Sequence, residues 1–304
     1  MNGCAGYDAI AHVYEKLNSE IDYARWADFI EKAFDKYLPS RPELVLDLAC
    51  GTGTMTRELS SRGYDMIGID GSADMLTQAY MKAAEGNGKP ILYLNQDMRE
   101  FELYGTVGAV VCCLDSINYL LSEKDVKKTF SLVHNYLDPD GLFLFDVNTP
   151  YKFENVYADN AYILEDEMEE NFGDGESEKY AVFCGWQNQY DKQSGICDFY
   201  LSIFEENGDS YIRQDEHQQE RCYTKETLNT LLEESGFELL GYFADYDFGE
   251  PRANTERWYI AARAKNRKVF TSLFSKSDRR SNARSVGRPP QRSKFPIVRK
   301  RHEG

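Results

Sequence analysis

Two patterns of apolar residues alternate along the chain between residues 43 and 147. Short, nearly continuous apolar runs predict buried strands, and apolar residues at helical spacing predict helices. The strands are expected near 44–49, 65–70, 91–95, 108–113 and 142–147, and the helices near 54–62, 72–85 and 123–137. Apolar strands that alternate with helices are typical of a parallel sheet covered on both faces. We therefore expect an α/β core over residues 41–149.

The segments before and after this core are also patterned. Residues 5–38 carry two apolar stripes at helical spacing, which predict a helical lid within residues 1–40. Near the end, residues 224–236 predict one more helix, followed by strands near 237–244 and 257–264. We assign residues 223–264 to the same core.

Residues 150–222 interrupt the alternation of strands and helices. Three β-rich runs, at 180–186, 196–204 and 210–215, are separated by turn residues and predict an antiparallel β insertion. We expect this insertion to cover the substrate. The stretch 165–178 is acidic and contains no Lys or Arg, so it predicts a solvated loop. Its charge could instead favour a cationic substrate.

Charge divides the chain into two parts. Residues 265–304 hold 13 Lys and Arg against 2 Asp and Glu, whereas residues 1–264 hold 22 against 49. The composition of 265–304 predicts a disordered basic tail. An acidic body repels polyanions, which argues against nucleic acid or an anionic membrane as its main partner. RNA is a possible partner of the tail.

The seven cysteines show no CxxC spacing, and several lie inside apolar runs. This usage predicts reduced core thiols and no metal site. No apolar run approaches the roughly 20 residues that span a bilayer, and no leader pattern begins the chain. We expect a cytoplasmic protein without a membrane partner, and the oligomeric state is left open.

The stretch 44–54 carries the most chemical information. An apolar strand containing Asp47 ends in the turn Ala49-Cys-Gly-Thr-Gly53, and a helix follows. Such a turn presents backbone N–H groups to a ligand. Asp70 ends the next strand, where a carboxylate suits a ribose diol. These features predict a nucleoside-containing cofactor.

Two further observations bear on the choice of cofactor. The dinucleotide pattern requires a third glycine at position 56, and Thr56 stands there, which disfavours a nicotinamide-dependent oxidoreductase. An unpaired carboxylate is costly to bury in an apolar strand, so Asp47 is expected to have a functional or hydrogen-bonded role.

The segment Leu46-Asp-Leu-Ala-Cys-Gly-Thr-Gly53 resembles motif I of class I S-adenosylmethionine-dependent methyltransferases. The order of elements is similar to that fold, a Rossmann-like sheet of seven strands with the last one antiparallel. More specifically, residues 5–264 resemble the YqeM-like bacterial methyltransferases. The other matching pieces are Tyr14 and the segments 23–26, 68–76, 96–99, 114–120 and 141–147.

The resemblance implies S-adenosylmethionine as the cofactor and assigns residues to it. Gly51 and Gly53 would let the backbone approach its methionine part, and Asp70 would accept both ribose hydroxyls. Asp97 and the backbone N–H of Met98 would contact the adenine. The full implied set is Asp47, Ala49, Gly51, Gly53, Asp70, Gly71, Asp97, Met98 and Leu114.

The implied reaction is methyl transfer to a nucleophilic N, O or C atom, most simply of a small-molecule acceptor. It needs alignment more than a protein nucleophile. Position along the chain suggests candidates for the acceptor side of the site: Tyr14, Asp115, Asn118, Tyr119 and Asn148. An RNA-modifying methyltransferase, or an RNA-associated protein that uses the basic tail, is the alternative.

Overall fold

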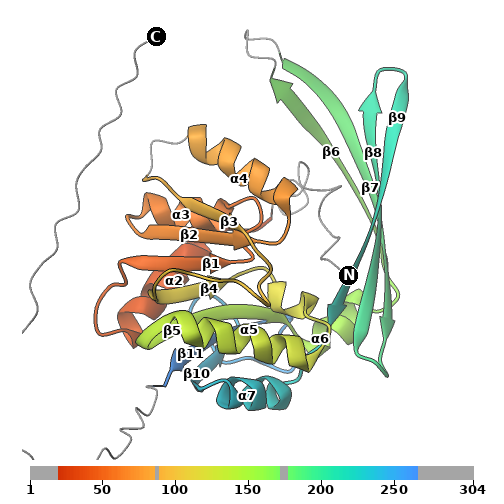
Figure 1. The fold of residues 1–304 in the computed structure, drawn as a ribbon. Coiled ribbons are helices and arrows are strands. Elements are labelled where there is room, and N and C mark those ends of the chain that lie inside the picture. The colour runs from red at the N-terminus through yellow and green to blue at the C-terminus, as the bar shows by residue number, and fades with distance from the viewer. Residues whose placement is uncertain (1–19, 86–88, 172–176, 266–304) are drawn as a thin grey trace, which may run out of the picture. The chain divides into compact units, whose positions relative to one another are not determined.

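The computed structural model describes residues 20–265, apart from 86–88 and 172–176 (Figure 1). These residues belong to one compact unit that extends to Arg267. The first predicted helix, Tyr14 and the basic tail beyond Lys265 lie outside the described residues.

A seven-stranded sheet forms the centre of this unit. Its order is β10-β11-β5-β4-β1-β2-β3, and β11 runs antiparallel to both of its neighbours. The predicted fold, with an antiparallel last strand, is confirmed. The strands are β1 (Leu44–Leu48), β2 (Asp65–Asp70), β3 (Leu92–Asn95), β4 (Val107–Cys112), β5 (Leu137–Asn148), β10 (Phe237–Phe243) and β11 (Arg257–Ala264).

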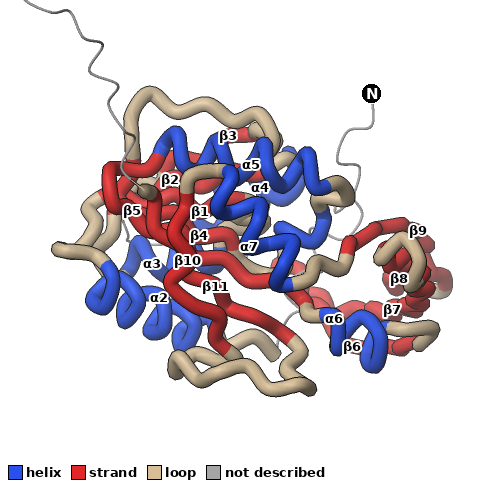
Figure 2. The backbone as a smooth tube through the Cα atoms, turned by 90° about the horizontal axis from the view of Figure 1, so that it is seen from below, coloured by secondary structure: helices blue, strands red, loops and turns tan. Residues whose placement is uncertain are grey.

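Helices cover both faces of the sheet (Figure 2). On one face lie α2 (Tyr23–Tyr37) and α3 (Thr54–Ser61), and on the other lie α5 (Glu123–Tyr136) and α7 (Lys225–Glu234). A further helix, α4 (Ala73–Glu85), packs on β3. Both faces of the sheet are therefore shielded from solvent, which is why the sequences of these strands are nearly continuous apolar runs.

Local signals account for where these helices begin. The Ser122 hydroxyl accepts from the Asp125 N–H at the start of α5, and Thr224 does the same for Thr227 at the start of α7. Asp22 caps α2 by accepting from the Arg25 N–H. Each cap satisfies a backbone N–H that has no partner within its helix.

A separate antiparallel sheet stands beside the seven-stranded one (Figure 1). Its order is β6-β7-β8-β9, and the short helices α6 (Pro150–Lys152) and η2 (Phe153–Tyr157) lead into it. Its strands are β6 (Ala161–Asn171), β7 (Ser177–Asp191), β8 (Ile196–Asn207) and β9 (Ser210–Arg221). The predicted antiparallel insertion is present, and its strands are longer than the predicted runs.

The prediction of a loop over 165–178 was wrong where the chain is described. Residues up to Asn171 belong to β6, and Ser177 begins β7, with which β6 pairs. Acidic residues have low strand propensity, so the sequence pattern hid this strand. Backbone pairing with β7 does not depend on those side chains, and an edge strand tolerates charge.

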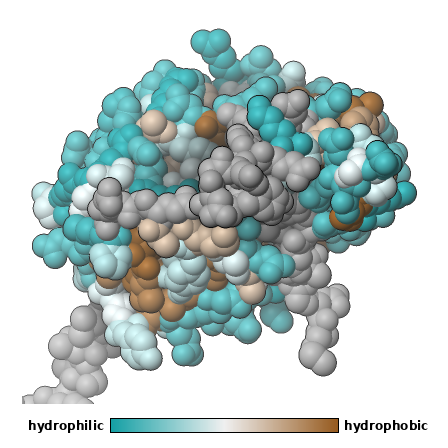
Figure 3. Space-filling model, turned by 90° about the horizontal axis from the view of Figure 1, so that it is seen from above, coloured by the Kyte–Doolittle hydropathy of each residue, from teal (hydrophilic) through white to brown (hydrophobic). Residues whose placement is uncertain are grey.

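The surface of the described residues is largely hydrophilic in the view of Figure 3. Among the described residues, no helix is both long and apolar enough to cross a membrane.

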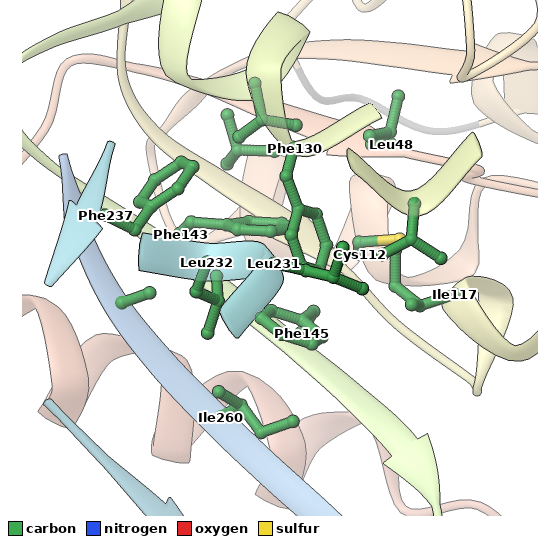
Figure 4. Close-up of a cluster of buried hydrophobic side chains, with 14 of the residues drawn as sticks. Leu48, Cys112, Ile117, Phe130, Phe143, Phe145, Leu231, Leu232, Phe237 and Ile260 are labelled. Carbon is green, nitrogen blue, oxygen red and sulfur yellow. The ribbon is translucent and has the colours of Figure 1, made fainter. Parts of the chain in front are cut away.

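Phenylalanine rings pack against one another in the core between the sheet and helices α5 and α7 (Figure 4). Phe143 is fully buried, and its ring stacks on Phe145 at 4.6 Å and also contacts Phe130 and Phe237. Because truncation removes these contacts and leaves a cavity, Phe143→Ala should lower the free energy of unfolding by about 3–5 kcal/mol. Urea unfolding measures this change.

Tyr104→Ala is the matched control, since Tyr104 is fully exposed. It should change the free energy of unfolding by less than about 0.5 kcal/mol. Equal losses in the two variants would contradict the assignment of the core.

Candidate active site

The turn after β1 is built on a left-handed backbone. Ala49, Gly51 and Gly53 have φ values of 60°, 55° and 74°. A Cβ at Gly53 would collide with the Tyr93 hydroxyl, so packing requires glycine there. A Cβ at Gly51 would meet no described atom within 4 Å. The turn therefore leaves open space directly beside the Gly51 backbone, and α3 begins immediately after it.

Asp47 lies buried in β1 beneath this turn. Its Oδ2 accepts a hydrogen bond from the Thr56 hydroxyl at 2.5 Å. Burial raises the pKa of Asp47 to about 7, although the hydrogen bond from Thr56 opposes the shift. Thr56 occupies the position at which a dinucleotide-binding turn has its third glycine. In this chain its hydroxyl instead donates a hydrogen bond to the buried carboxyl of Asp47.

Asp70, at the end of β2, connects two turns. Its Oδ2 accepts from the Gly51 N–H and its Oδ1 from the Ser72 N–H, both at 2.8 Å. Burial raises the pKa of Asp70, and these N–H groups oppose the shift. Ser72 itself caps α4, because its hydroxyl accepts from the Met75 N–H. The carboxyl of Asp70 is therefore bonded to the glycine turn and does not itself cap α4.

The chain after β3 places Asp97 close to the end of β2. The Gln96 N–H donates to the Asp70 carbonyl at 3.0 Å, which holds the two strand ends together. The Arg99 guanidinium binds both carboxylate oxygens of Asp97, with Nε 2.9 Å from Oδ1. Met98 is half-buried against the core.

A hollow lies over the glycine turn between α2 and the end of β4. Its free volume, including the part open to solvent, is about 370 Å³. The residues that line it are Tyr23, Asp47, Ala49, Cys50, Gly51, Thr52, Thr54, Met55, Cys113, Leu114 and Ser116. Of the predicted cofactor residues, Asp47, Ala49, Gly51 and Leu114 thus share one hollow. Asp70 does not line the hollow, but its carboxylate is bonded to the N–H of Gly51, which does.

At the end of β4 the backbone again turns left-handed. Leu114 and Asp115 have φ values of 59° and 49°, a region that side-chain-bearing residues rarely adopt. The Asp115 N–H donates to Oδ2 of Asp146 at 2.9 Å. Arg257 bridges the two carboxylates, with Nη2 2.7 Å from Asp115 Oδ1 and Nη1 on Asp146. The ion pairs of Arg257 with Asp115 and Asp146 thus hold Asp115 in this uncommon backbone conformation.

Two asparagines extend the polar network from β4 to the insertion. The Asn118 side chain accepts from the Asn148 N–H at 2.9 Å and donates to the Arg221 carbonyl at 2.8 Å. The Asn148 Nδ2 donates to Glu220 Oε2 at 3.0 Å and to the Tyr157 hydroxyl at 3.1 Å. Both asparagines are fully buried, so these bonds hold the last strand of the insertion against the core.

Two other contacts complete this region. Lys152 Nζ donates to Asn148 Oδ1 at 3.1 Å, and the Tyr119 hydroxyl donates to Gln218 Oε1 at 3.1 Å. The structure therefore brings together the predicted residues Asp115, Asn118, Tyr119 and Asn148. Tyr14, the fifth candidate, lies outside the described residues.

Comparison with known proteins identifies the family. The family described as a methyltransferase domain matches residues 45–141. YqeM of Bacillus subtilis (strain 168), a protein named as a methyltransferase, is 37% identical over 84% of this chain and 96% of its own length. A solved S-adenosylmethionine-dependent methyltransferase from Clostridium acetobutylicum is 30% identical, with a TM-score of 0.72, over 86% of this chain and 99% of that one.

The chain belongs to the YqeM-like S-adenosylmethionine-dependent methyltransferases. The sugar N-methyltransferase KedS8 from Streptoalloteichus shares the fold, with a TM-score of 0.66 at 19% identity over 84% of this chain and 92% of that one. The cofactor of this methyltransferase is S-adenosylmethionine.

Sequence reasoning missed several polar residues of this methyltransferase. They are Asp146, Lys152, Tyr157, Glu220 and Arg257. Asp146 carried a signal, because it interrupts an apolar strand as Asp47 does. Lys152 and Tyr157 follow β5 closely, whereas Glu220 and Arg257 come from distant parts of the chain, and only folding brings them to this network.

The buried Asp47 predicts an unusual dependence of stability on pH. An Asp in an unfolded chain has a pKa near ~3.9, and burial in the folded state raises that of Asp47 to about 7. The folded state therefore binds more protons between these values, so stability should fall as pH rises through them. Asp47→Asn should be more stable than wild type at pH 8, by up to about 4 kcal/mol at ~1.4 kcal/mol per pKa unit.

Urea unfolding at pH 5 and pH 8 tests this, with Asp35→Asn, on the exposed side of α2, as the control. Part of the pH dependence should persist in Asp47→Asn, because burial also raises the pKa of Asp146 to about 6. A variant less stable than wild type at both pH values would contradict the argument.

Proposed function

We propose that this protein transfers the methyl group of S-adenosylmethionine to a nucleophilic atom of a small-molecule acceptor, in the hollow over the glycine turn. The observation that carries the proposal is the hydrogen bond from the Gly51 N–H to Asp70. It joins the turn after β1 to the carboxyl end of β2, beside open space at Gly51. Bound ligands lie at this edge in open α/β sheets.

The residues at this edge suit the polar parts of the cofactor. We assign Gly51, Gly53 and Ala49 to backbone contact with the methionine part, and Asp47 to the support of its amino group. Each carboxylate oxygen has two lone pairs, so Asp70 can accept ribose hydroxyls in addition to its backbone bonds. The sulfonium methyl is already activated, so no protein nucleophile is needed.

The adenine is assigned to the turn after β3. Asp97 accepts from the adenine amino group, and the Met98 N–H donates to the ring. The Arg99 guanidinium contacts both oxygens of the Asp97 carboxylate and fixes it in position. Gly71 is assigned to the adenine as well, and Leu114, which lines the hollow, to the border between cofactor and acceptor.

The acceptor is assigned to the space between the end of β4 and the insertion. Two contacts support the insertion, residues 150–222, as its cover: Tyr119 with Gln218, and Asn148 with Glu220. The remaining divisions are proposed as before, with a lid at 1–40, the core at 41–149 and 223–264, and a tail at 265–304. The shared fold of KedS8, named for its action on a sugar, supports a small-molecule acceptor over RNA.

Binding of S-adenosylhomocysteine tests the cofactor assignment. Asp70→Asn removes one acceptor from a carboxylate that also holds the glycine turn. The affinity of this variant for S-adenosylhomocysteine should therefore fall about 10- to 100-fold, which is the effect of losing a charged hydrogen bond of ~1.5–3 kcal/mol. Titration calorimetry measures the affinity.

Asp65→Asn is the control, because Asp65 lies at the opposite end of β2 in an exposed pair with Lys89. It should bind like wild type. Tight binding of NAD by the wild-type protein, without binding of S-adenosylhomocysteine, would contradict the proposal.

A further inference from the structure

The polar network behind Asp115 contains more carboxyls than cations. Asp115, Asp146 and Glu220 supply three carboxyls, and Lys152 and Arg257 supply two cationic side chains. Uncompensated charge is costly to bury, so one carboxyl must hold a proton or face another cation. The network is formally neutral when a single proton resides in it.

Glu220 is the carboxyl best placed to hold that proton. Its carboxyl is hydrogen-bonded to that of Asp115, and its Oε2 accepts from Asn148 at 3.0 Å. Asp115 is held instead by the Arg257 guanidinium at 2.7 Å. Two carboxyls that share a hydrogen bond cannot both be ionised at low cost.

The surroundings separate the two pKa values. Burial, and then the charge of Asp115, raise the pKa of Glu220 well above its usual range. Arg257 and Lys152 lower the pKa of Asp115 despite its burial. A pair whose pKa values are driven apart has the properties of an acid–base couple.

Several other titratable groups face this pair. Lys152 of α6 has a lowered pKa, because of burial and of Arg257. Tyr157 of η2, Cys197 of β8 and Glu256, next to β11, also interact with the network.

The pair lies next to the hollow, although neither carboxyl is among the residues that line it. Leu114 and Ser116, on either side of Asp115, line that hollow. The Asp115 side chain is 13% exposed, whereas Glu220 is 3% exposed as a residue. Of the two carboxyls, Asp115 is therefore the more exposed and the nearer to a ligand in the hollow.

This arrangement suits a cationic acceptor. Residues 1–264 carry a large excess of Asp and Glu, which favours the approach of cations. A protonated amine also lacks the lone pair that methyl transfer requires, and it would be repelled by a sulfonium, so it has to lose a proton first. A neutral alcohol presents no such charge.

We propose that the acceptor is an amine, and that Glu220, acting through Asp115, takes up the proton of its ammonium group. The inference rests on the function proposed above. Binding of the ammonium brings a further cation to the network, so the proton that Glu220 holds in the free protein leaves to solvent. Asp115 then receives the proton from the ammonium and passes it to the ionised Glu220, which leaves a neutral amine.

The nitrogen lone pair then forms the new N–CH₃ bond as the S–CH₃ bond breaks, and the electron pair of the broken bond stays on sulfur. The products are S-adenosylhomocysteine and a methylated ammonium, and Glu220 is left protonated, as in the free protein. Asp115 is the residue that contacts the acceptor, and Glu220 is the positioning and proton-storing residue behind it.

Glu220→Gln tests this without opening the network. The amide oxygen still accepts from Asn148 and the amide N–H still donates to Asp115, but the side chain cannot take up a proton. Glu238→Gln is the matched control, because Glu238 lies on β10 in an exposed contact with Arg263.

Wild type, Glu220→Gln and Glu238→Gln are assayed with methyl-labelled S-adenosylmethionine on matched acceptors: benzylamine against benzyl alcohol, and glucosamine against glucose. We expect label on the amines and not on the hydroxyl counterparts. At pH 7, kcat/KM of Glu220→Gln should fall at least ~100-fold, the scale of a lost general base. The deficit should narrow above pH 9, where amines are increasingly neutral in solution. Glu238→Gln should match wild type.

Calorimetry with S-adenosylhomocysteine separates the two proposals. If wild type fails to bind it, the proposed function fails. The amine assignment alone is overturned if it binds while label goes to hydroxyls or to no amine. A deficit in Glu220→Gln that is absent, or equal at every pH, overturns the role of Glu220.

Discussion

Burial of carboxyl groups inside apolar strands is the constraint on which the rest of this site depends. Asp47 and Asp146 are almost fully buried, each near the carboxyl end of a parallel strand. A carboxyl there needs a partner from outside its own strand. Thr56 from the following helix serves Asp47, while Arg257 and the Asp115 N–H serve Asp146. The turn after β4 is thus bonded to Asp146, and the helix that follows the glycine turn is bonded to Asp47.

The antiparallel direction of β11 makes the second of these arrangements possible. In a parallel sheet, strand starts lie at the edge opposite to the strand ends. Because β11 is reversed, its first residue, Arg257, pairs with Asn148 at the end of β5. A cation at the start of this strand thus reaches carboxylates at the ends of β4 and β5. The reversed strand therefore has a chemical consequence as well as a topological one.

Local patterns sufficed to predict the fold around the glycine turn but not the polar network behind Asp115. The sheet, its helices and the glycine turn follow from periodicity, caps and a continuous segment between Asp47 and Thr56. Glu220 and Arg257 carry no local signal, because each acquires its role from contacts with residues 72 or more positions away. Strand β6 escaped prediction for a related reason, since its pairing with β7 resides in the backbone. Asp146 could have been found by the desolvation argument that was applied to Asp47.

This difference has a physical basis in how the two half-sites are assembled. The half proposed to hold the cofactor is one strand–turn–helix unit that Asp70 connects to the next strand, so its residues lie close together in the sequence. The other half is closed by β9, whose Gln218 and Glu220 contact Tyr119 and Asn148 of the core. Under the proposed function, substitutions along β9 can therefore change the acceptor without contacting the glycine turn. A change at Asn148 would instead disturb both the end of β5 and the insertion, since its backbone ends that strand while its side chain holds the insertion in place.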